Sequence, residues 1–514
     1  MTEKRGGIGR EDGIGSRALA ALAQKNAPVV IVFALCIVRI WLMPLPSSFW
    51  GDETATVFVV RHGAAHPSFA VAPQLPASLY YWLPRAADRL FGISEIGYRI
   101  PSVLAIGLAL WFVARISSRL IHPAAGWFAA IACLGLHPIN YYAVDARPYA
   151  LGIFMAAASV WFMVRWLDTA GWRDGLWFAA LSGIVLWVHA IYWPFYVLLA
   201  LYSIFRLWRK ETPAGLGKAV AVFSIIGLIL LPVFVRAISL YSEAHKHVVT
   251  QLPSAKGLVH SLNLRLIVIC GVAALLLWLV FRWRREKSGI AGSSYLLIAG
   301  WWLCQPVFLF LFSHATGNSV FINRYLSLSL PAVALASTVA VSFFLPKAYW
   351  KPATLALAIG ILWMKSDWRQ VWPDHDENWR GAAQAINRAI ADSDSPVICI
   401  SPFIEGRWPA WRPDYGLPGF LYSHLTAYPI RGQICPFPID KSFEAEQYAE
   451  NLIRTKIPMA GRFIVYGKKS EVPMWRAWFG GRPELAGWSG RSLGAFKGVE
   501  AVLFEHVPRP TARY

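Results

Sequence analysis

Apolar runs long enough to cross a bilayer repeat along most of this 514-residue chain. A run of roughly 20 apolar residues spans the hydrocarbon layer as a helix. Eleven such segments fall near residues 28–46, 100–116, 124–139, 149–166, 175–189, 191–207, 219–237, 264–281, 294–313, 325–345 and 352–365. Only 15% of the residues are charged, against about 25% in soluble globular domains. The pattern predicts a polytopic α-helical membrane protein and excludes a string of soluble domains.

Basic residues outnumber acidic ones by 49 to 29, a net charge of +20. They gather at the ends of the apolar segments, where the membrane explains them, so nucleic acid is not an expected partner. Because basic loops stay in the cytoplasm, the N-terminus is predicted to be cytoplasmic and residues 366–514 extracytoplasmic. The short leader and compact loops favour a bacterial inner (plasma) membrane.

The apolar segments and the charge distribution together divide the chain into three parts. Residues 1–27 form a basic cytoplasmic leader, residues 28–365 form the membrane domain with a long outer loop at 47–99, and residues 366–514 form a periplasmic domain. Within the outer loop, residues 76–92 predict an interfacial helix that holds Arg85 at the level of the lipid headgroups. Strands at 396–401, 462–466 and 501–505 and helices at 379–391 and 443–455 predict a small α/β fold for the last part.

The six cysteines and twelve histidines form no metal-binding motif. No cofactor is therefore expected, although acidic outer loops could hold a divalent metal. Cys399 and Cys435 share the C-terminal part and could pair in an oxidising compartment, or remain free thiols.

The acidic pair Asp52 and Glu53 lies a few residues beyond the first apolar segment. A carboxylate beside the hydrocarbon boundary lies in a reduced dielectric and suits general-base work on a hydroxyl. The competing interpretation is a solvated pair of loop acids.

A second candidate group lies at the outer end of the third apolar segment, where Asp145 and Arg147 precede a proline and Tyr149. Substrate binding and a structural ion pair between helices are both compatible with this spacing. A third group, Arg324 and Tyr325, opens the tenth segment, where it could bind an anion or anchor the helix at the interface.

Weaker candidates are His189, beside Tyr192 at an outer hairpin, and the run His245–His247. A structural histidine is the competing interpretation for His189, and the second run has too few partners for a metal site.

The stronger candidates all fall on the outer side under one topology deduced from other residues. Arginines there can bind a lipid-linked phosphate, and an acid can deprotonate an incoming hydroxyl. A reaction on a lipid-linked phosphate at the membrane surface is therefore the favoured interpretation.

The order of these motifs resembles the GT-C membrane glycosyltransferases. The motifs are a Gly51-Asp52-Glu53 outer loop, an amphipathic Leu79-Tyr80-Tyr81-Trp82-Leu83 segment, Arg99-Ile100-Pro101-Ser102, Asp145-Ala146-Arg147-Pro148-Tyr149, and Arg324-Tyr325-Leu326. The likeness covers about residues 28–345. It is greatest to the branch with the protein O-mannosyltransferases, the lipid A aminoarabinose transferase and the lipopolysaccharide galacturonosyltransferases.

This resemblance implies transfer of a sugar from a polyprenyl-phosphate donor by an inverting single displacement. Asp52 matches the catalytic acid of the first outer loop, with Glu53 beside it, and Asp145 matches the second acidic motif. Arg147 and Arg324 would bind the donor phosphate. The implied acceptor is lipid A or lipopolysaccharide, a cell-wall glycan or a protein. Tyr149, Tyr325, Arg85 and His189 complete the predicted substrate site.

Two other functions fit a chain of eleven spans: a transporter or flippase of a lipid-linked glycan, and a scaffold whose outer domain recruits partners. Few acids lie in the middle of the apolar segments, which argues against transport. Only a transferase should depend on the Asp52 carboxylate in particular.

Overall fold

The computed structural model describes residues 26–72, 75–247, 251–283, 289–365, 372, 376–390 and 395–506, without the side chains of residues 237–247. The predicted leader lies outside these residues except for its last two positions. The side chains of the run His245–His247 also lie outside them.

Up to Lys365, the secondary structure of the described residues is helical. After an apolar helix at Asn26–Leu42, they form η1 (Val38–Leu42), α2 (Gly51–His62), η2 (Pro67–Val71), η3 (Leu75–Ala77), η4 (Leu79–Tyr81), α3 (Trp82–Phe91), α4 (Glu95–Leu120), α5 (Gly126–Leu134), α6 (His137–Ala143), α7 (Tyr149–Thr169), α8 (Trp172–Val188), η5 (Ala190–Tyr192), α9 (Pro194–Trp208), α10 (Leu216–His247), α11 (Ala255–Ser261), α12 (Leu264–Phe281), α13 (Gly292–Thr316), η6 (Asn323–Ser329), α14 (Leu330–Ser342), η7 (Lys347–Tyr349) and α15 (Trp350–Lys365). The prediction of a polytopic α-helical membrane protein is confirmed.

All eleven predicted apolar segments fall on helical residues. In the part of the chain that the structure describes, seven helical stretches are long and apolar enough to cross a membrane: Glu95–Leu120, Tyr149–Thr169, Ala190–Trp208, Leu216–Arg236, Leu264–Phe281, Gly292–Thr316 and Asn323–Ser342. The predicted segment at 124–139 is divided into the short helices α5 and α6. Pro138 lies in the first turn of α6, where its missing N–H costs nothing.

A five-stranded sheet forms the centre of the C-terminal domain. Its elements are α16 (Trp379–Ala389), β1 (Pro396–Ile400), η8 (Phe420–Tyr422), α17 (His424–Ala427), β2 (Gln433–Phe437), α18 (Phe443–Thr455), α19 (Ile457–Ala460), β3 (Arg462–Lys468), α20 (Val472–Gly480), η9 (Pro483–Leu485), β4 (Trp488–Ser492) and β5 (Val499–His506). The strand order is β2-β1-β3-β5-β4. β1 pairs in parallel with β2 and β3, and β5 runs antiparallel to β3 and β4. The predicted α/β fold of this domain is confirmed.

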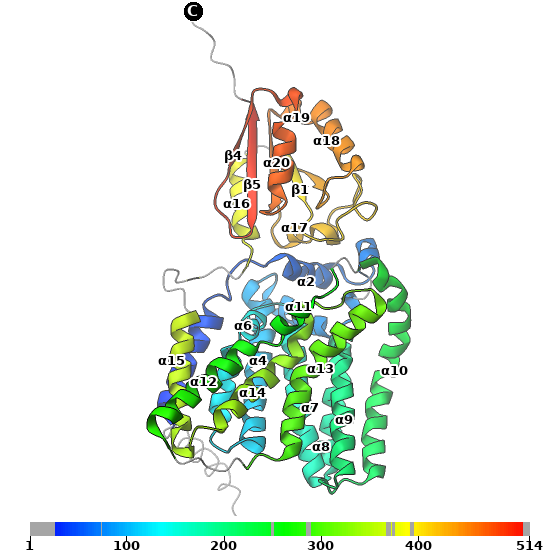
Figure 1. Ribbon diagram of the computed structural model, residues 1–514. Helices are drawn as coiled ribbons and strands as arrows, with labels where there is room; N and C mark the ends of the chain where they lie inside the picture. The colour runs from blue at the N-terminus through cyan, green and yellow to red at the C-terminus, as the bar shows by residue number, and fades with distance from the viewer. Residues whose placement is uncertain are drawn as a thin grey trace, which may run out of the picture.

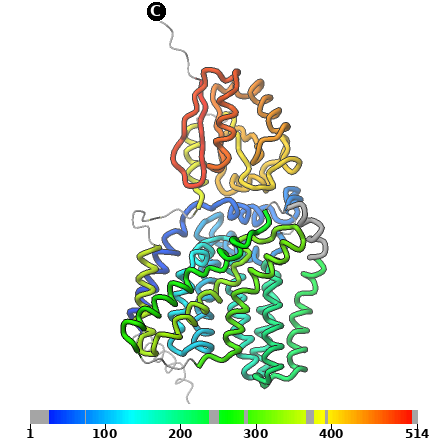
Figure 2. Tube along the Cα trace, in the orientation of Figure 1, coloured from blue at the N-terminus to red at the C-terminus, as the bar shows by residue number. Residues whose placement is uncertain are grey.

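The C-terminal domain lies on one end of the helix bundle, and α2 lies between the two (Figure 1). The tube trace in the same orientation shows the first outer loop and the lower edge of the domain side by side (Figure 2). One apolar cluster joins them, since Phe49, Phe58 and Tyr81 of the loop share it with Trp379 and Phe420 of the domain. The outer loop and the C-terminal domain therefore form a common core.

The outer loop differs from its prediction in two places. Asp52 and Glu53 lie in the first turn of α2, where a plain loop was predicted. The predicted interfacial helix begins as a helix only at Trp82, because 3-10 turns precede it. Its apolar residues divide between two faces: Tyr80 is buried against the protein, while Trp82 and Leu90 are exposed.

Cys399 and Cys435 are both buried free thiols. They lie on the neighbouring strands β1 and β2, but the register places Cys435 beside Ile398. Because side chains alternate between the faces of a sheet, the two sulfur atoms project to opposite faces. The pairing that the sequence left open is absent.

Candidate active site

The Asp52–Glu53 pair lies at the N-terminus of α2. The backbone of Trp50 is extended, and its N–H donates to Glu53 Oε2 at 3.2 Å, a capping contact from the first turn. Carboxylates in a first turn are favoured by the partial positive charge of the helix N-terminus. This explains why a segment that opens with Gly-Asp-Glu starts a helix here.

Two arginines hold the Asp52 carboxylate. Arg324 Nη1 donates to Asp52 Oδ2 at 2.6 Å, and Arg147 Nη2 lies 3.8 Å from the same oxygen. Arg147 Nη1 also donates to the Asp52 carbonyl at 3.2 Å. The three residues come from α2, η6 and the loop before α7, so the fold gathers three separate sequence motifs at one point.

Asp52 is ionised in this setting. Burial disfavours the charged carboxylate, but the guanidinium groups of Arg324 and Arg147 and the ammonium group of Lys468 outweigh burial and hold its pKa below the ordinary value. The side chain keeps 18% of its surface exposed, so a substrate can reach it.

Glu53 occupies a different environment on the same helix. It is fully buried, and both of its carboxylate oxygens accept hydrogen bonds from Arg99: Nε donates to Oε1 at 2.8 Å and Nη2 donates to Oε2 at 2.5 Å. The N–H of Ala146 donates to Oε1 at 2.7 Å. Glu53 therefore ties α2 to α4 and to the loop of Asp145, and has no free oxygen for chemistry. The predicted catalytic role does not fit this geometry; a positioning role does.

Asp145 is buried, and one of its oxygens faces no donor. Its Oδ1 accepts from Trp50 Nε1 at 3.0 Å, while Oδ2 has no hydrogen-bond partner among the described residues. Burial raises the pKa of Asp145 well above its ordinary value, and the charge of Glu53 raises it further. The pKa of Asp145 is thus shifted toward the neutral acid, the opposite direction to the shift at Asp52.

Three further buried polar atoms near this cluster lack partners within the described ranges: Arg147 Nε, Arg324 Nε and the Tyr80 hydroxyl. Native proteins rarely leave such groups unpaired. Two guanidinium N–H donors, an acid and a phenol are together suited to an anionic, hydroxylated ligand.

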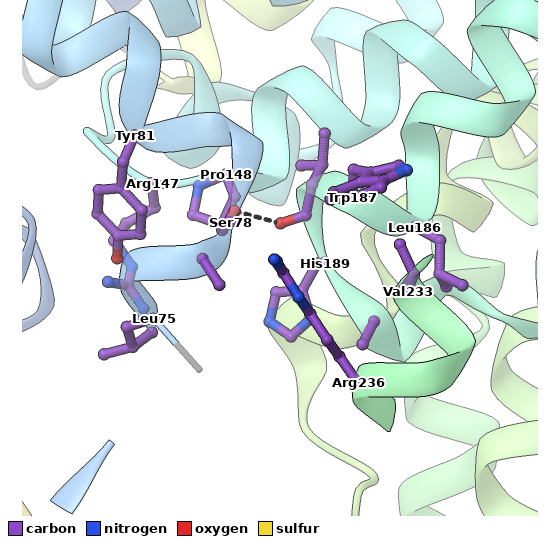
Figure 3. Close-up of a pocket in the computed structure, with 13 residues that line it drawn as sticks. Leu75, Ser78, Tyr81, Arg147, Pro148, Leu186, Trp187, His189, Val233 and Arg236 are labelled. Atoms are coloured by element: carbon purple, nitrogen blue, oxygen red, sulfur yellow. Dashed lines mark hydrogen bonds between the residues drawn. The ribbon is translucent and has the colours of Figure 1, made fainter. Parts of the chain in front are cut away.

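A cavity of about 140 Å³ adjoins Arg147. Its walls are largely apolar and come from the segment before α3, the end of α8 and α10; they include Leu75, Tyr81, Val188 and Val233. Figure 3 shows Arg147 and Arg236 reaching into it from different walls, with His189 behind and a hydrogen bond from Ser78 to the Val188 carbonyl (2.7 Å). An apolar cavity that is also lined by two cations, Arg147 and Arg236, fits a lipid that carries an anionic head.

Three more predicted site residues pack against one another beside this cavity. The His189 ring lies 6.3 Å from that of Tyr149 and 5.1 Å from that of Tyr325, and Arg324 lies over Tyr325. His189 Nδ1 accepts from the Ile191 N–H at 3.3 Å, which fixes its ring. Arg85, half-buried on α3, makes no hydrogen bond or ion pair with this group in the part of the chain that the structure describes.

Sequence reasoning left five neighbouring residues without a role: Tyr80, Arg99, Arg236, Glu377 and Lys468. Arg99 and Arg236 could have been found, because an arginine within an apolar helix needs a polar partner or a substrate. Glu377 and Lys468 carried no such signal, since both lie in a polar domain far from α2 in sequence. Within the described residues, no group of three or more His, Cys, Asp or Glu side chains is placed to hold a metal ion.

Residues 76–237 match the family of dolichyl-phosphate-mannose-protein mannosyltransferases. The comparison with curated proteins gave no match. Two crystal structures of ArnT from Cupriavidus metallidurans, one bound to undecaprenyl phosphate and one in the apo state, share the fold. Each has a TM-score of 0.53 at 12% identity, over 92% of this chain and 97% of ArnT. AglB from Archaeoglobus fulgidus, in complex with an inhibitory peptide and a dolichol-phosphate, has a TM-score of 0.46 at 12% identity, over 95% of this chain and 74% of AglB.

Proposed function

We propose that this chain, which has the fold of the GT-C glycosyltransferases, is itself a membrane glycosyltransferase that uses a polyprenyl-phosphate-linked sugar as donor. The resemblance to this superfamily inferred from sequence motifs is confirmed by the family match and by the ArnT fold. The observation that carries the proposal is the ion-paired cluster of Asp52, Arg147 and Arg324, in which Arg147 also lines an apolar cavity.

Arg147 and Arg324 bind the donor phosphate. Each has a buried Nε–H without a partner among the described residues, and a guanidinium matches phosphate oxygens in geometry as well as charge. The apolar walls formed by α8, α10 and the segment before α3 receive the start of the polyprenyl chain. ArnT, whose structure holds undecaprenyl phosphate, supports this choice of lipid.

Asp52 is the general base. In the free protein it is ionised but weakly basic, because the two arginines neutralise it. A phosphate that binds these arginines draws their charge away from Asp52, which raises the basicity of the carboxylate once donor is present. The site is thereby activated by its own substrate.

Transfer is a single displacement at the anomeric carbon. The acceptor hydroxyl oxygen attacks that carbon from the face opposite the phosphate, and its proton passes to Asp52. The bond between the anomeric carbon and the phosphate oxygen breaks, and polyprenyl phosphate leaves with the electron pair, stabilised by Arg147 and Arg324. The product has inverted configuration.

Asp145 binds the sugar as a neutral acid. Opposite pKa shifts in two neighbouring carboxyls separate acid and base roles, and Asp145 Oδ2 can donate to or accept from a sugar hydroxyl. His189, Tyr149 and Tyr325 form the wall next to Arg324. Glu53 fixes the start of α2, and Arg85 lies at the membrane interface without contacting the donor.

The site faces the extracytoplasmic side, as the distribution of basic loops indicates, and the membrane is a bacterial inner membrane. The proposed division keeps residues 28–365 as the transferase domain and residues 366–514 as a periplasmic domain. The acceptor is a lipid A or lipopolysaccharide sugar, a cell-wall glycan or a protein hydroxyl.

A transfer assay in membranes tests the proposal. Radiolabelled sugars carried on undecaprenyl phosphate are supplied to membranes with the wild-type protein or Asp52→Asn. Label that enters an acceptor only with the wild type supports the transferase. Movement of intact labelled donor across the bilayer, equal in both proteins and without transfer, would instead establish a transporter.

A further inference from the structure

The C-terminal domain reaches directly to the first turn of the helix that carries Asp52. Glu377, at the start of this domain, is buried, and its Oε2 accepts from the N–H of Gly51 at 2.8 Å. The same oxygen accepts from Trp379 Nε1 at 2.6 Å. A carboxylate at a helix N-terminus satisfies a free backbone donor and the helix dipole. Here that carboxylate comes from more than 300 residues away.

Lys468 completes this contact from the carboxyl end of β3. Its Nζ lies 3.1 Å from Glu377 Oε1. A Cβ built on Gly51 would lie 3.4 Å from Glu377 Oε2 and 3.7 Å from Lys468 Nζ. The Glu377–Lys468 pair therefore lies against the residue that immediately precedes Asp52.

The surrounding interface keeps the pair in place. Tyr428 donates to Glu95 Oε1 at 2.8 Å and accepts from the Phe49 N–H at 2.7 Å. Arg380 Nη1 donates to the same Glu95 oxygen at 2.9 Å. Thr54 of α2 shares a hydrogen bond of 2.8 Å with Ser423. These contacts join the C-terminal domain, which carries Lys468 on β3, to α2, α4 and the segment before α2.

We propose that Lys468 is a positioning residue for the transfer reaction: it holds Glu377 against the first turn of α2 and supplies a third positive charge beside Asp52. The inference rests on the proposed function, in which Asp52 is the base. Lys468 contributes to keeping Asp52 ionised. Whereas the donor phosphate competes with Asp52 for Arg147 and Arg324, Lys468 stays paired with Glu377. When the donor phosphate engages the two arginines, Lys468 is the cation that remains to fix the protonation of Asp52.

The charged and titratable groups that act on Asp52 come from each element around it: Arg324, Arg147, Lys468, Asp145, Tyr81, Tyr141 and Tyr149. Within this set Lys468 alone belongs to the C-terminal domain. A change at Lys468 therefore tests the domain's contribution without touching the phosphate-binding arginines.

The test compares Lys468→Met, Lys468→Arg and a matched control, Lys469→Met, in the full-length protein. Lys469 is the next residue and is exposed, so its removal takes the same charge from the same strand end. Two quantities are measured across pH: the transfer rate, and equilibrium binding of undecaprenyl phosphate in detergent.

We expect Lys468→Met to lower kcat by roughly tenfold to a hundredfold, the scale of small displacements of a catalytic group. Activity is lost as pH falls through the pKa of Asp52, which gives the pH–rate profile an acid limb. Loss of the Lys468 charge raises this pKa and so moves the limb to higher pH. Lys468→Arg should keep the limb of the wild type, and Lys469→Met should change neither quantity. A limb that stays in place in Lys468→Met, or moves equally in Lys469→Met, overturns the inference.

Equilibrium binding of undecaprenyl phosphate tests the role of Lys468 even if no sugar is transferred. Protonation of Asp52 frees the arginines, so undecaprenyl phosphate should bind more tightly below that pKa, and this step should vanish in Asp52→Asn. Lys468→Met should move the step to higher pH. Absence of transfer by the wild type would refute the proposed function, whereas an unmoved binding step would refute the role of Lys468.

Discussion

Asp52 and Glu53 are adjacent in sequence, share the first turn of one helix and have opposite environments. Glu53 is enclosed, with Arg99 and the Ala146 N–H on its oxygens. Asp52 is partly exposed and held by arginines that have buried donors to spare. The difference teaches that an acidic pair at a membrane boundary can divide its work. One carboxylate builds the helix start, and the other is left for substrate.

The same contrast extends to the arginines. Arg99 also donates to the carbonyls of Leu45, Ser47 and Ser48, so its donors are used within the protein. Within the described part of the chain, Arg147 and Arg324 each keep an unpaired buried Nε–H. A saturated guanidinium belongs to the scaffold, and an unsaturated one belongs to the binding site.

Breaking the buried pair should have the largest effect on stability. Glu53→Gln or Arg99→Met leaves a buried charge without its partner, which costs about 3–5 kcal/mol. Denaturant unfolding in detergent measures this. As control, Arg407→Met removes an ion pair that is exposed on both sides, and exposed pairs contribute ~0.2–1 kcal/mol. Equal losses in both proteins would show that the enclosure of Glu53 has no special role.

Weakening the open cluster should affect donor use while the fold remains. Arg324→Lys and Arg147→Lys keep the charge but lose the planar fork of donors. Loss of a charged hydrogen bond costs about 1.5–3 kcal/mol, so we expect KM for the donor to rise roughly tenfold to a hundredfold. Arg89→Lys, on the exposed face of α3, is the control. An unchanged KM in both variants would remove the arginines from the phosphate site.

The smallest expected effect is the contribution of Asp145 to the pH dependence of the free energy of unfolding. Because its pKa is raised in the folded state, its stabilising contribution is complete below about pH 4, the value of an unfolded aspartate. That contribution is lost as pH rises toward the folded pKa. Asp145→Asn keeps an acceptor for Trp50 and cannot ionise. Its unfolding free energy should therefore decline less than that of the wild type between acidic and neutral pH, and a parallel decline would contradict a neutral Asp145.

Much of the fold could be predicted because bilayer helices have a strong signal. The apolar segments identified the bundle, and the topology deduced from the basic loops predicted that Asp52, Arg147 and Arg324 lie on one side. α2 was missed because its sequence has neither a marked apolar stripe nor a long apolar run. β2 was missed because Pro436 interrupts a short run, and β4 because Gly490 and Arg491 make it a polar edge strand.

The division of roles between Asp52 and Glu53 could not be predicted in the same way. It depends on Arg99 lying opposite one carboxylate and Arg324 opposite the other, which is a matter of helix rotation rather than of spacing in sequence. The contact of Glu377 and Lys468 with Gly51 is still harder to foresee. It joins two domains through side chains that would be unremarkable on any polar surface.

Donor binding and sugar transfer by Asp52→Asn, measured on the same purified sample, test the central claim most directly. The account predicts that undecaprenyl phosphate binds at least as tightly as to the wild type, because the arginines lose a competitor. It also predicts that transfer falls about 10²–10⁴-fold, the usual contribution of a general base. Transfer at the wild-type rate, or loss of binding together with transfer, would contradict a base that shares its arginines with the donor phosphate.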